Sequence, residues 1–252
     1  ELVVRAQGDP AAAEAFLEAD LCYPDGVGAV WAAGRQGARL PGPDGVTGPE
    51  RVAGIDLAQR VLELAAERGL SVFFLGAAPG VAEEAARRQV DRLPSLRVVG
   101  THHGYFSAAE EAAVVSMVRD ARPDILLVAM GAPRQETLLY CHREEWGAAV
   151  GMGIGGSFDV WAGKVTRAPE WTQRARIEWL YRLARDPRRL RRQKALPRYA
   201  TQVMRWSADD YGPPRRGRAA ASVASEPARG EAAAGPDAAG PDAGSPDQDG
   251  RP

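Results

Sequence analysis

Four apolar runs separated by single helices constrain the fold of this chain more than any other feature of its sequence. The runs are SVFFL, LRVVG, DILLVAM and AAVGMGI, at residues 71–75, 96–100, 124–130 and 148–154. Amphipathic patterns predict helices before the first run and between successive runs, at residues 56–69, 80–93, 107–121 and 134–146. Strands that are apolar throughout are buried on both faces, and parallel strands need crossover helices. The sequence therefore predicts an α/β fold, a parallel sheet with helices on both faces.

The apolar content that builds such a core ends near Trp206. Residues 207–252 contain no Leu, Ile, Met, Phe or Trp, so we expect a disordered Ala/Gly/Pro/Asp-rich tail. Just before it, nine Lys or Arg stand against one acid between Arg182 and Arg205, although the whole chain has 32 basic and 33 acidic residues. We predict a core at 1–163, a basic helical C-terminal appendage at 164–206 and the tail at 207–252.

Cysteine and histidine usage gives little reason to expect a metal site or a disulfide. Cys22 and Cys141 have no CxxC spacing, and we expect two buried thiols. His102 and His103 are adjacent, so their side chains diverge and cannot jointly grip one metal ion. The chain has no run of eighteen apolar residues and no signal-peptide pattern. It begins at Glu1 inside a predicted helix, so we expect a partial sequence.

A glycine-rich loop follows each predicted strand. These loops are GAAPGV, GTHHGYF, MGAPRQE and GIGGSFD, beginning at residues 76, 100, 130 and 153. Ligands of parallel sheets bind at the carboxyl ends of the strands, and free amides at helix N-termini favour anions. None of the loops is a GxGxxG fingerprint or a GxxxxGK[ST] loop. Together they predict a cleft that binds phosphate or a nucleotide.

Two polar residues near these loops allow both a structural and a chemical interpretation. Asp25 lies in YPDGVG, which is a strong turn sequence, but a carboxylate on a rigid loop is also a candidate general base. Gln135 lies in the first turn of a predicted helix, and its amide is suited to read a sugar hydroxyl or a base edge. The basic appendage is either an anion-binding segment or a solvated helix face.

Seven motifs, in order along residues 1–205, resemble the WecG/TagA/CpsF family of bacterial glycosyltransferases. They are YPDGVG, RVAGIDL, FLGAAPGVAEEA, VVGTHHGYF, MGAPRQE, GIGGSFDVWAGKVTRAPEW and IEWLYRLARDPRRLRRQ. The resemblance implies a Rossmann-like fold and an inverting transfer that needs no metal or other cofactor. The donor would be a UDP-sugar carrying N-acetylmannosamine or its uronate. The acceptor would be N-acetylglucosamine on a polyprenyl diphosphate, for cell-envelope polysaccharide or teichoic acid synthesis.

The resemblance also implies roles for individual residues. Asp25 becomes the general base that takes the proton of the acceptor hydroxyl. Gln135 matches a family residue of the sugar site, and Arg51, Gly76 and Asp159 fall in motifs that line the cleft.

In the family, arginines of a C-terminal appendage neutralise the diphosphate of the departing UDP, because no metal does so. Arg182, Arg189 and Arg192 occupy the matching positions, and the planar guanidinium suits phosphate oxygens. Four further arginines would face anionic lipids at the cytoplasmic face of the membrane, where the protein would be peripheral: Arg185, Arg188, Arg191 and Arg198. A homo-oligomer would compete with the appendage for the cleft, so the oligomeric state stays open.

The chain also differs from the family pattern. Family members begin with some forty further residues, as we expect of a partial sequence here. The 34–50 connection is longer than in the family, and the tail has no family counterpart. Two other classes of function are alternatives to a glycosyltransferase. A nucleic-acid-binding protein would use the basic segment, but the cleft loops are nearly neutral. A nicotinamide-dependent oxidoreductase would need the glycine fingerprint that is missing here.

Overall fold

The computed structural model describes residues 2–35, 51–169, 172 and 196–205. The chain divides into two units, Glu1–Gly217 and Arg218–Pro252, and every described residue belongs to the first. Most of the 34–50 connection, most of the predicted appendage and the 207–252 tail lie outside the described residues. The domain boundaries at 163 and 206 therefore stay predictions.

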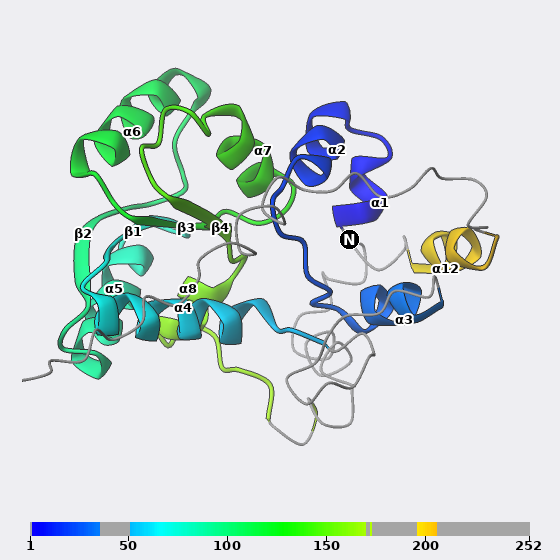
Figure 1. Cartoon of the computed structure of the whole chain (residues 1–252), viewed down its shortest axis with the longest axis horizontal. Coiled ribbons are helices and arrows are strands. Elements are labelled where there is room, and N and C mark those ends of the chain that lie inside the picture. The colour runs from blue at the N-terminus through cyan, green and yellow to red at the C-terminus, as the bar shows by residue number, and fades with distance from the viewer. Residues whose placement is uncertain (1, 36–50, 170–171, 173–195, 206–252) are drawn as a thin grey trace, which may run out of the picture. The chain divides into compact units, whose positions relative to one another are not determined.

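The four apolar runs form one parallel sheet, as predicted (Figure 1). Its strands are β1 (Ser71–Gly76), β2 (Arg97–His102), β3 (Ile125–Ala129) and β4 (Val150–Gly153), in the spatial order β2-β1-β3-β4. Every residue of the central strands β1 and β3 is buried. The edge strands β2 and β4 are more exposed, because each has a neighbouring strand on one side alone.

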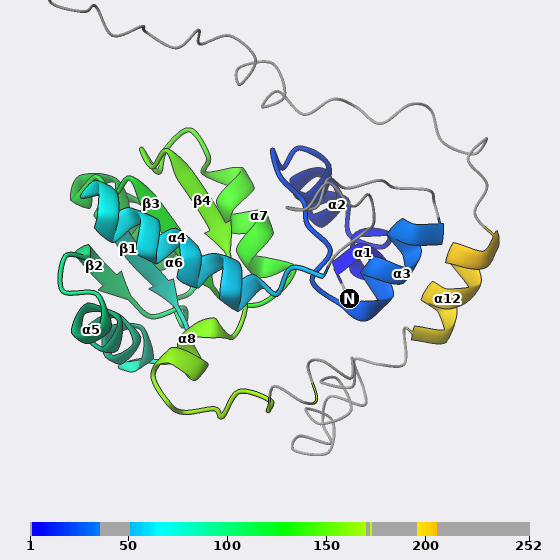
Figure 2. The same cartoon turned by 60° about the horizontal axis from the view of Figure 1, so that its bottom comes forward.

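Helices cover both faces of this sheet, which confirms the predicted fold class. They are α4 (Gly54–Arg68), α5 (Val81–Arg92), α6 (Ala108–Ala121), α7 (Arg134–Cys141) and α8 (Ser157–Trp161). Side chains alternate along a strand, so Val72 and Phe74 of β1 pack in one apolar cluster with α4, α5 and α8. Phe73 and Leu75 pack in a second cluster with α6 and α7. The two layers are visible in Figure 1, and α4 crosses one face of the sheet in Figure 2.

Four more helices flank this core in sequence. They are α1 (Leu2–Ala6), α2 (Pro10–Leu17), α3 (Val27–Arg35) and α12 (Leu196–Arg205). The Tyr140 hydroxyl of α7 donates to Glu14 Oε1 of α2 at 2.8 Å. The Tyr199 hydroxyl of α12 donates to the Gly28 carbonyl oxygen of α3 at 3.3 Å. These contacts link the N-terminal helices to α7 on one side and to α12 on the other.

Most predicted element boundaries lie within two or three residues of the observed ones, and one helix is clearly shorter. The capping box of Ser107 and Glu110 is present at the start of α6. In contrast, α7 ends at Cys141 and not at residue 146. There the His142 ring is held by Glu111 of α6 at 2.9 Å and by Glu145 at 2.8 Å. The Glu145 amide donates to the His142 carbonyl oxygen, so the chain continues in tight turns.

The expectation that both cysteines are buried is wrong. Cys22 and Cys141 are both exposed, and both are free thiols. Cys22 lies in the segment between α2 and α3, and Cys141 is the last residue of α7. The Cys22 thiol nevertheless contacts the Phe16 carbonyl oxygen at 3.5 Å, and partial burial raises the pKa of this thiol.

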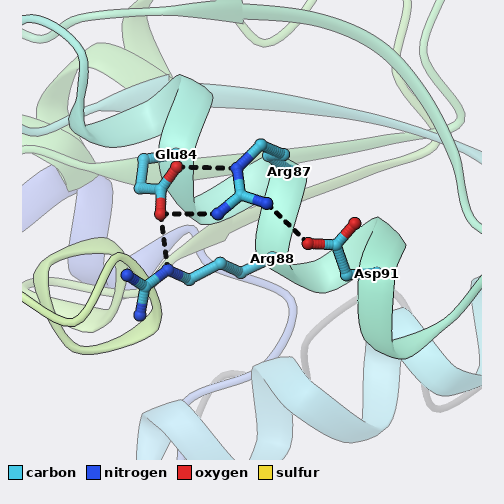
Figure 3. Close-up of polar contacts among 4 residues, drawn as sticks. All are labelled: Glu84, Arg87, Arg88 and Asp91. Atoms are coloured by element: carbon cyan, nitrogen blue, oxygen red, sulfur yellow. Dashed lines mark hydrogen bonds and ion pairs between the residues drawn. The ribbon is translucent and has the colours of Figure 1, made fainter.

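The solvent side of α5 carries a network of ion pairs (Figure 3). The Glu84 carboxylate contacts Arg87 Nε at 2.8 Å and Arg88 Nε at 2.6 Å, and Arg87 also reaches Asp91 at 2.7 Å. Residues three and four apart are neighbours on a helix surface, so the sequence spacing produces this network. Hydrogen bonds from Arg87 and Arg88 lower the pKa of Glu84 to about 2.

Candidate active site

An open cleft lies along the carboxyl edge of the sheet. All four glycine-rich loops contribute to its lining, through Ala77 after β1, Gly104 after β2, Gly131 after β3 and Gly155 after β4. The segment before α3 and the N-terminal turn of α4 also line the cleft. The sequence-based prediction that the loops after the strands meet at one site is therefore confirmed.

Gly76 holds the loop after β1 against the end of β3. Its φ is 137°, and a Cβ built on it would collide with the carbonyl oxygen of Ala129. This approach allows the Ala77 amide to donate to the Ala129 carbonyl oxygen at 2.7 Å. The Ala77 carbonyl oxygen in turn accepts from the Gly104 amide at 2.8 Å. The glycine at position 76 thus allows backbone hydrogen bonds that join the loops after β1 and β2 to the end of β3.

Gln135 joins the other two loops through its side chain. Its Oε1 accepts from the Gly131 amide at 3.1 Å and from the Gly155 amide at 3.0 Å. Its Nε2 donates to Glu136 Oε1 at 2.8 Å. The residue is 5% exposed. Its predicted role in reading a sugar stays a prediction, and its observed contacts are with the protein itself.

Asp25 and Arg51 meet at the cleft although 26 residues separate them in sequence. Arg51 Nε donates to the Asp25 carbonyl oxygen at 2.7 Å, and Arg51 Nη2 lies 3.9 Å from Asp25 Oδ1. The Asp25 side chain is 59% exposed. Residues 21–25 belong to no helix or strand, and the chain bends at Gly26, immediately before α3. The structure thus places the Asp25 carboxylate at the cleft on an anchored segment, and its role as a general base stays a prediction.

Tyr23 is a cleft residue that reasoning from sequence missed. A Cβ built on Gly54 would lie 3.0 Å from the Tyr23 hydroxyl oxygen and 3.8 Å from Asp25 Oδ2, so both groups lie against the start of α4. Burial raises the pKa of Tyr23, and the carboxylates of Asp25 and Glu136 raise it further. Tyr23 is therefore a neutral hydroxyl beside two carboxylates. Its place in YPDGVG, two residues before Asp25, was the available signal.

Asp159 lies in the first turn of α8 and lines the same cleft. Its carbonyl oxygen accepts from the amides of Lys164 and Val165 at 2.8 and 3.1 Å, which turns the chain after α8. Further on, Arg167 Nη2 contacts Asp56 Oδ2 of α4 at 2.6 Å. The segment that begins at residue 153 therefore contacts α4, the helix whose first residue lies against Tyr23 and Asp25.

The three arginines expected to hold the diphosphate, Arg182, Arg189 and Arg192, lie outside the described residues. Within residues 2–35, 51–169, 172 and 196–205, no group of three or more His, Cys, Asp or Glu side chains is arranged to hold a metal ion. None of the helices in the described part of the chain is long and apolar enough to cross a membrane. Independence from metal stays a prediction.

The sequence is similar to a family of known proteins. The model of the glycosyl transferase WecG/TagA/CpsF family matches residues 1–212. An N-acetylglucosaminyldiphosphoundecaprenol N-acetyl-beta-D-mannosaminyltransferase of Bacillus spizizenii (strain W23) is 35% identical over 205 residues, which cover 81% of this chain and 76% of the relative. A protein of the same name from Bacillus subtilis (strain 168) is 31% identical over 192 residues, covering 76% of this chain and 71% of the relative.

Proposed function

The chain belongs to the WecG/TagA/CpsF family of glycosyltransferases, and from that membership we propose that it transfers N-acetylmannosamine or its uronate from a UDP donor to N-acetylglucosamine on a polyprenyl diphosphate. The names of the two relatives give N-acetylmannosamine as the transferred sugar and N-acetylglucosaminyldiphosphoundecaprenol as the acceptor. Membership in a family of glycosyltransferases argues against both alternatives, the nucleic-acid-binding protein and the nicotinamide-dependent oxidoreductase. The product would enter cell-envelope polysaccharide or teichoic acid synthesis.

The observation that carries this proposal is the anchored carboxylate of Asp25 in a cleft bounded by glycine loops. In the proposed step the acceptor hydroxyl attacks the anomeric carbon of the donor sugar. The new carbon–oxygen bond forms as the bond to the β-phosphate oxygen of UDP breaks, which inverts the anomeric centre. The Asp25 carboxylate takes the hydroxyl proton, and UDP leaves with the bonding electron pair. Arg51 keeps Asp25 in place through the 2.7 Å hydrogen bond to its backbone.

We propose Arg182, Arg189 and Arg192 as the groups that neutralise the leaving diphosphate, and Asp159 as a donor-binding residue. The described part of the appendage, α12, exposes Arg198 and Arg205. Exposed arginines on a helix attract anionic lipid headgroups by about 1 kcal/mol each near the surface. This supports a peripheral position at the inner face of the membrane, where the lipid-linked acceptor would be found.

The test is release of UDP from a panel of UDP-sugars in the presence of a short-chain polyprenyl-diphosphate-linked N-acetylglucosamine and EDTA. We expect release with UDP-N-acetylmannosamine or its uronate, only when the acceptor is present, and unaffected by the chelator. Release abolished by EDTA and restored by a divalent cation would overturn metal independence. Absence of both UDP release and UDP binding in a folded protein would overturn the proposed donor class.

The role of Asp25 is tested by Asp25→Asn, which keeps the shape of the side chain and removes the basic oxygen. We expect turnover to fall by about 10²–10⁴-fold, with the affinity for UDP retained. Asp91→Asn on α5 is a matched control, because Asp91 is 62% exposed and does not line the cleft. Unchanged turnover in Asp25→Asn would exclude Asp25 as the base.

A further inference from the structure

The orientation of the Gln135 amide is set by its three hydrogen bonds. Two backbone N–H groups, of Gly131 and Gly155, point at one end of the amide, and the Glu136 carboxylate lies at the other. The two backbone N–H groups are donors and need an acceptor, whereas the Glu136 carboxylate is an acceptor and needs a donor. The reversed amide would place donors against donors and the amide oxygen against the carboxylate. The oxygen therefore faces the two loops and the nitrogen faces Glu136.

The space around Gln135 is closely fitted. A Cβ built on Gly153 would lie 2.6 Å from Gln135 Nε2, so a larger residue at the end of β4 would displace the amide from this position. Among the described residues, the bond from Gln135 is the one hydrogen bond to the Glu136 carboxylate. At 5% exposure, Gln135 is shielded from water that could replace these partners. A buried amide with such partners holds its surroundings in one arrangement.

We infer that Gln135 is a positioning residue, whose carbonyl oxygen sets the separation of the loops after β3 and β4. Both loops line the cleft, and the Gln135 side chain accepts a hydrogen bond from one amide of each. Glu136 contributes to this positioning, because it accepts a hydrogen bond from the amide nitrogen and so keeps the amide oxygen directed at the two loops. The effect on turnover rests on the proposed function, whereas the effect on the loops does not.

The loop contacts are tested without any substrate, by hydrogen exchange of single backbone amides followed by NMR. Gln135→Met keeps an unbranched side chain but removes the acceptor, and we expect exchange of Gly131 and Gly155 to accelerate about tenfold. Gln135→Glu keeps an oxygen acceptor but sets it against the Glu136 carboxylate, so exchange at both amides should accelerate less than in Gln135→Met. The Ala77 amide, bonded to the backbone of Ala129, is the internal control. Unchanged exchange at Gly131 and Gly155 in Gln135→Met would overturn the inference.

The pairing with Glu136 is tested by exchanging the two side chains. Gln135→Glu alone places two carboxylates in contact, and we expect kcat/KM to fall about tenfold or more. The double variant Gln135→Glu with Glu136→Gln has the net charge of the wild type and can form all three hydrogen bonds, with the donor reversed. We expect it to recover to within about threefold of Glu136→Gln alone. Glu83→Gln, an exposed change in the first turn of α5, is the charge control.

A residue that instead binds the sugar directly would behave differently in the same experiments. The double variant would then stay as impaired as Gln135→Glu, with a raised KM for the donor and slow exchange at both glycine amides. That result would overturn positioning as the function of Gln135. If the wild type turned over no UDP-sugar at all, the proposed function would fail while the exchange measurements still decided the role of Gln135.

Discussion

Replacement of Gly76 by alanine tests how the loop after β1 is built. The backbone at this position has a φ of 137°, and the built Cβ lies 2.7 Å from the Ala129 backbone nitrogen as well as colliding with its carbonyl oxygen. Both neighbouring atoms are main chain in the centre of the sheet, so no side-chain rotation can relieve the contact. Either β1 and β3 separate locally, or the Ala77 hydrogen bond to Ala129 is lost.

The size of the effect follows from two contributions. A non-glycine residue in this backbone region costs about 1–3 kcal/mol, and overpacking against a fixed backbone costs about 1–3 kcal/mol more. We expect Gly76→Ala to lose about 2–6 kcal/mol out of a typical stability of about 5–15 kcal/mol. Gly80→Ala is the matched control, because its φ is 80° and its built Cβ meets no atom within 4 Å. It should lose only about 1–2 kcal/mol.

Urea unfolding followed by tryptophan fluorescence measures both variants, with the free energy of unfolding extrapolated to water. The informative quantity is the difference between Gly76→Ala and Gly80→Ala, since both contain the cost of a positive φ. Equal losses in the two variants would refute the steric argument. An altered slope against urea in Gly76→Ala would instead show that the native state had loosened.

Two further predictions concern the surface. The pKa of Glu84 is lowered from 4.5 to about 2 by Arg87 and Arg88, so the stability that this carboxylate contributes is present above pH 4.5 and is lost as the pH falls towards 2. The melting temperature of the wild type should exceed that of Glu84→Gln more at about pH 6 than at about pH 3; equal differences would show that the network in Figure 3 contributes nothing. Both exposed cysteines should react with iodoacetamide in the native protein, and Cys22 should react more slowly than Cys141, because its raised pKa leaves less thiolate. Peptide mass spectrometry gives the order, and faster labelling of Cys22 would contradict it.

The sheet could be predicted from sequence because burial on both faces leaves a strong signal. A strand such as SVFFL has no polar residue except the serine at its start, and a parallel sheet covered on both faces buries such a strand. The capping box at Ser107 is equally local, since its two partners are three residues apart. Features of this kind depend on short segments, and the structure confirms them.

Contacts between distant segments could not be predicted in the same way. The position of Arg51 against Asp25 depends on how the segment before α4 passes the segment before α3. Gln135 could be chosen from the sequence as a candidate site residue, but its hydrogen bonds could not be predicted. Its partners Gly131 and Gly155 belong to two loops whose separation depends on the tertiary structure. The cysteines were mispredicted because the average preference of a thiol for the interior says nothing about the individual positions of Cys22 and Cys141.

The order β2-β1-β3-β4 has a consequence for how this family diversifies. From β1 the chain leaves through α5 towards one face, and from the adjacent β3 it leaves through α7 towards the opposite face. The two connections diverge, so a crevice opens between them at this topological switch point. The opening is a product of connectivity and would survive extensive change in the residues that line it. The residues of the loops can therefore change, and with them the sugar that such a protein accepts, while the core of the sheet stays the same.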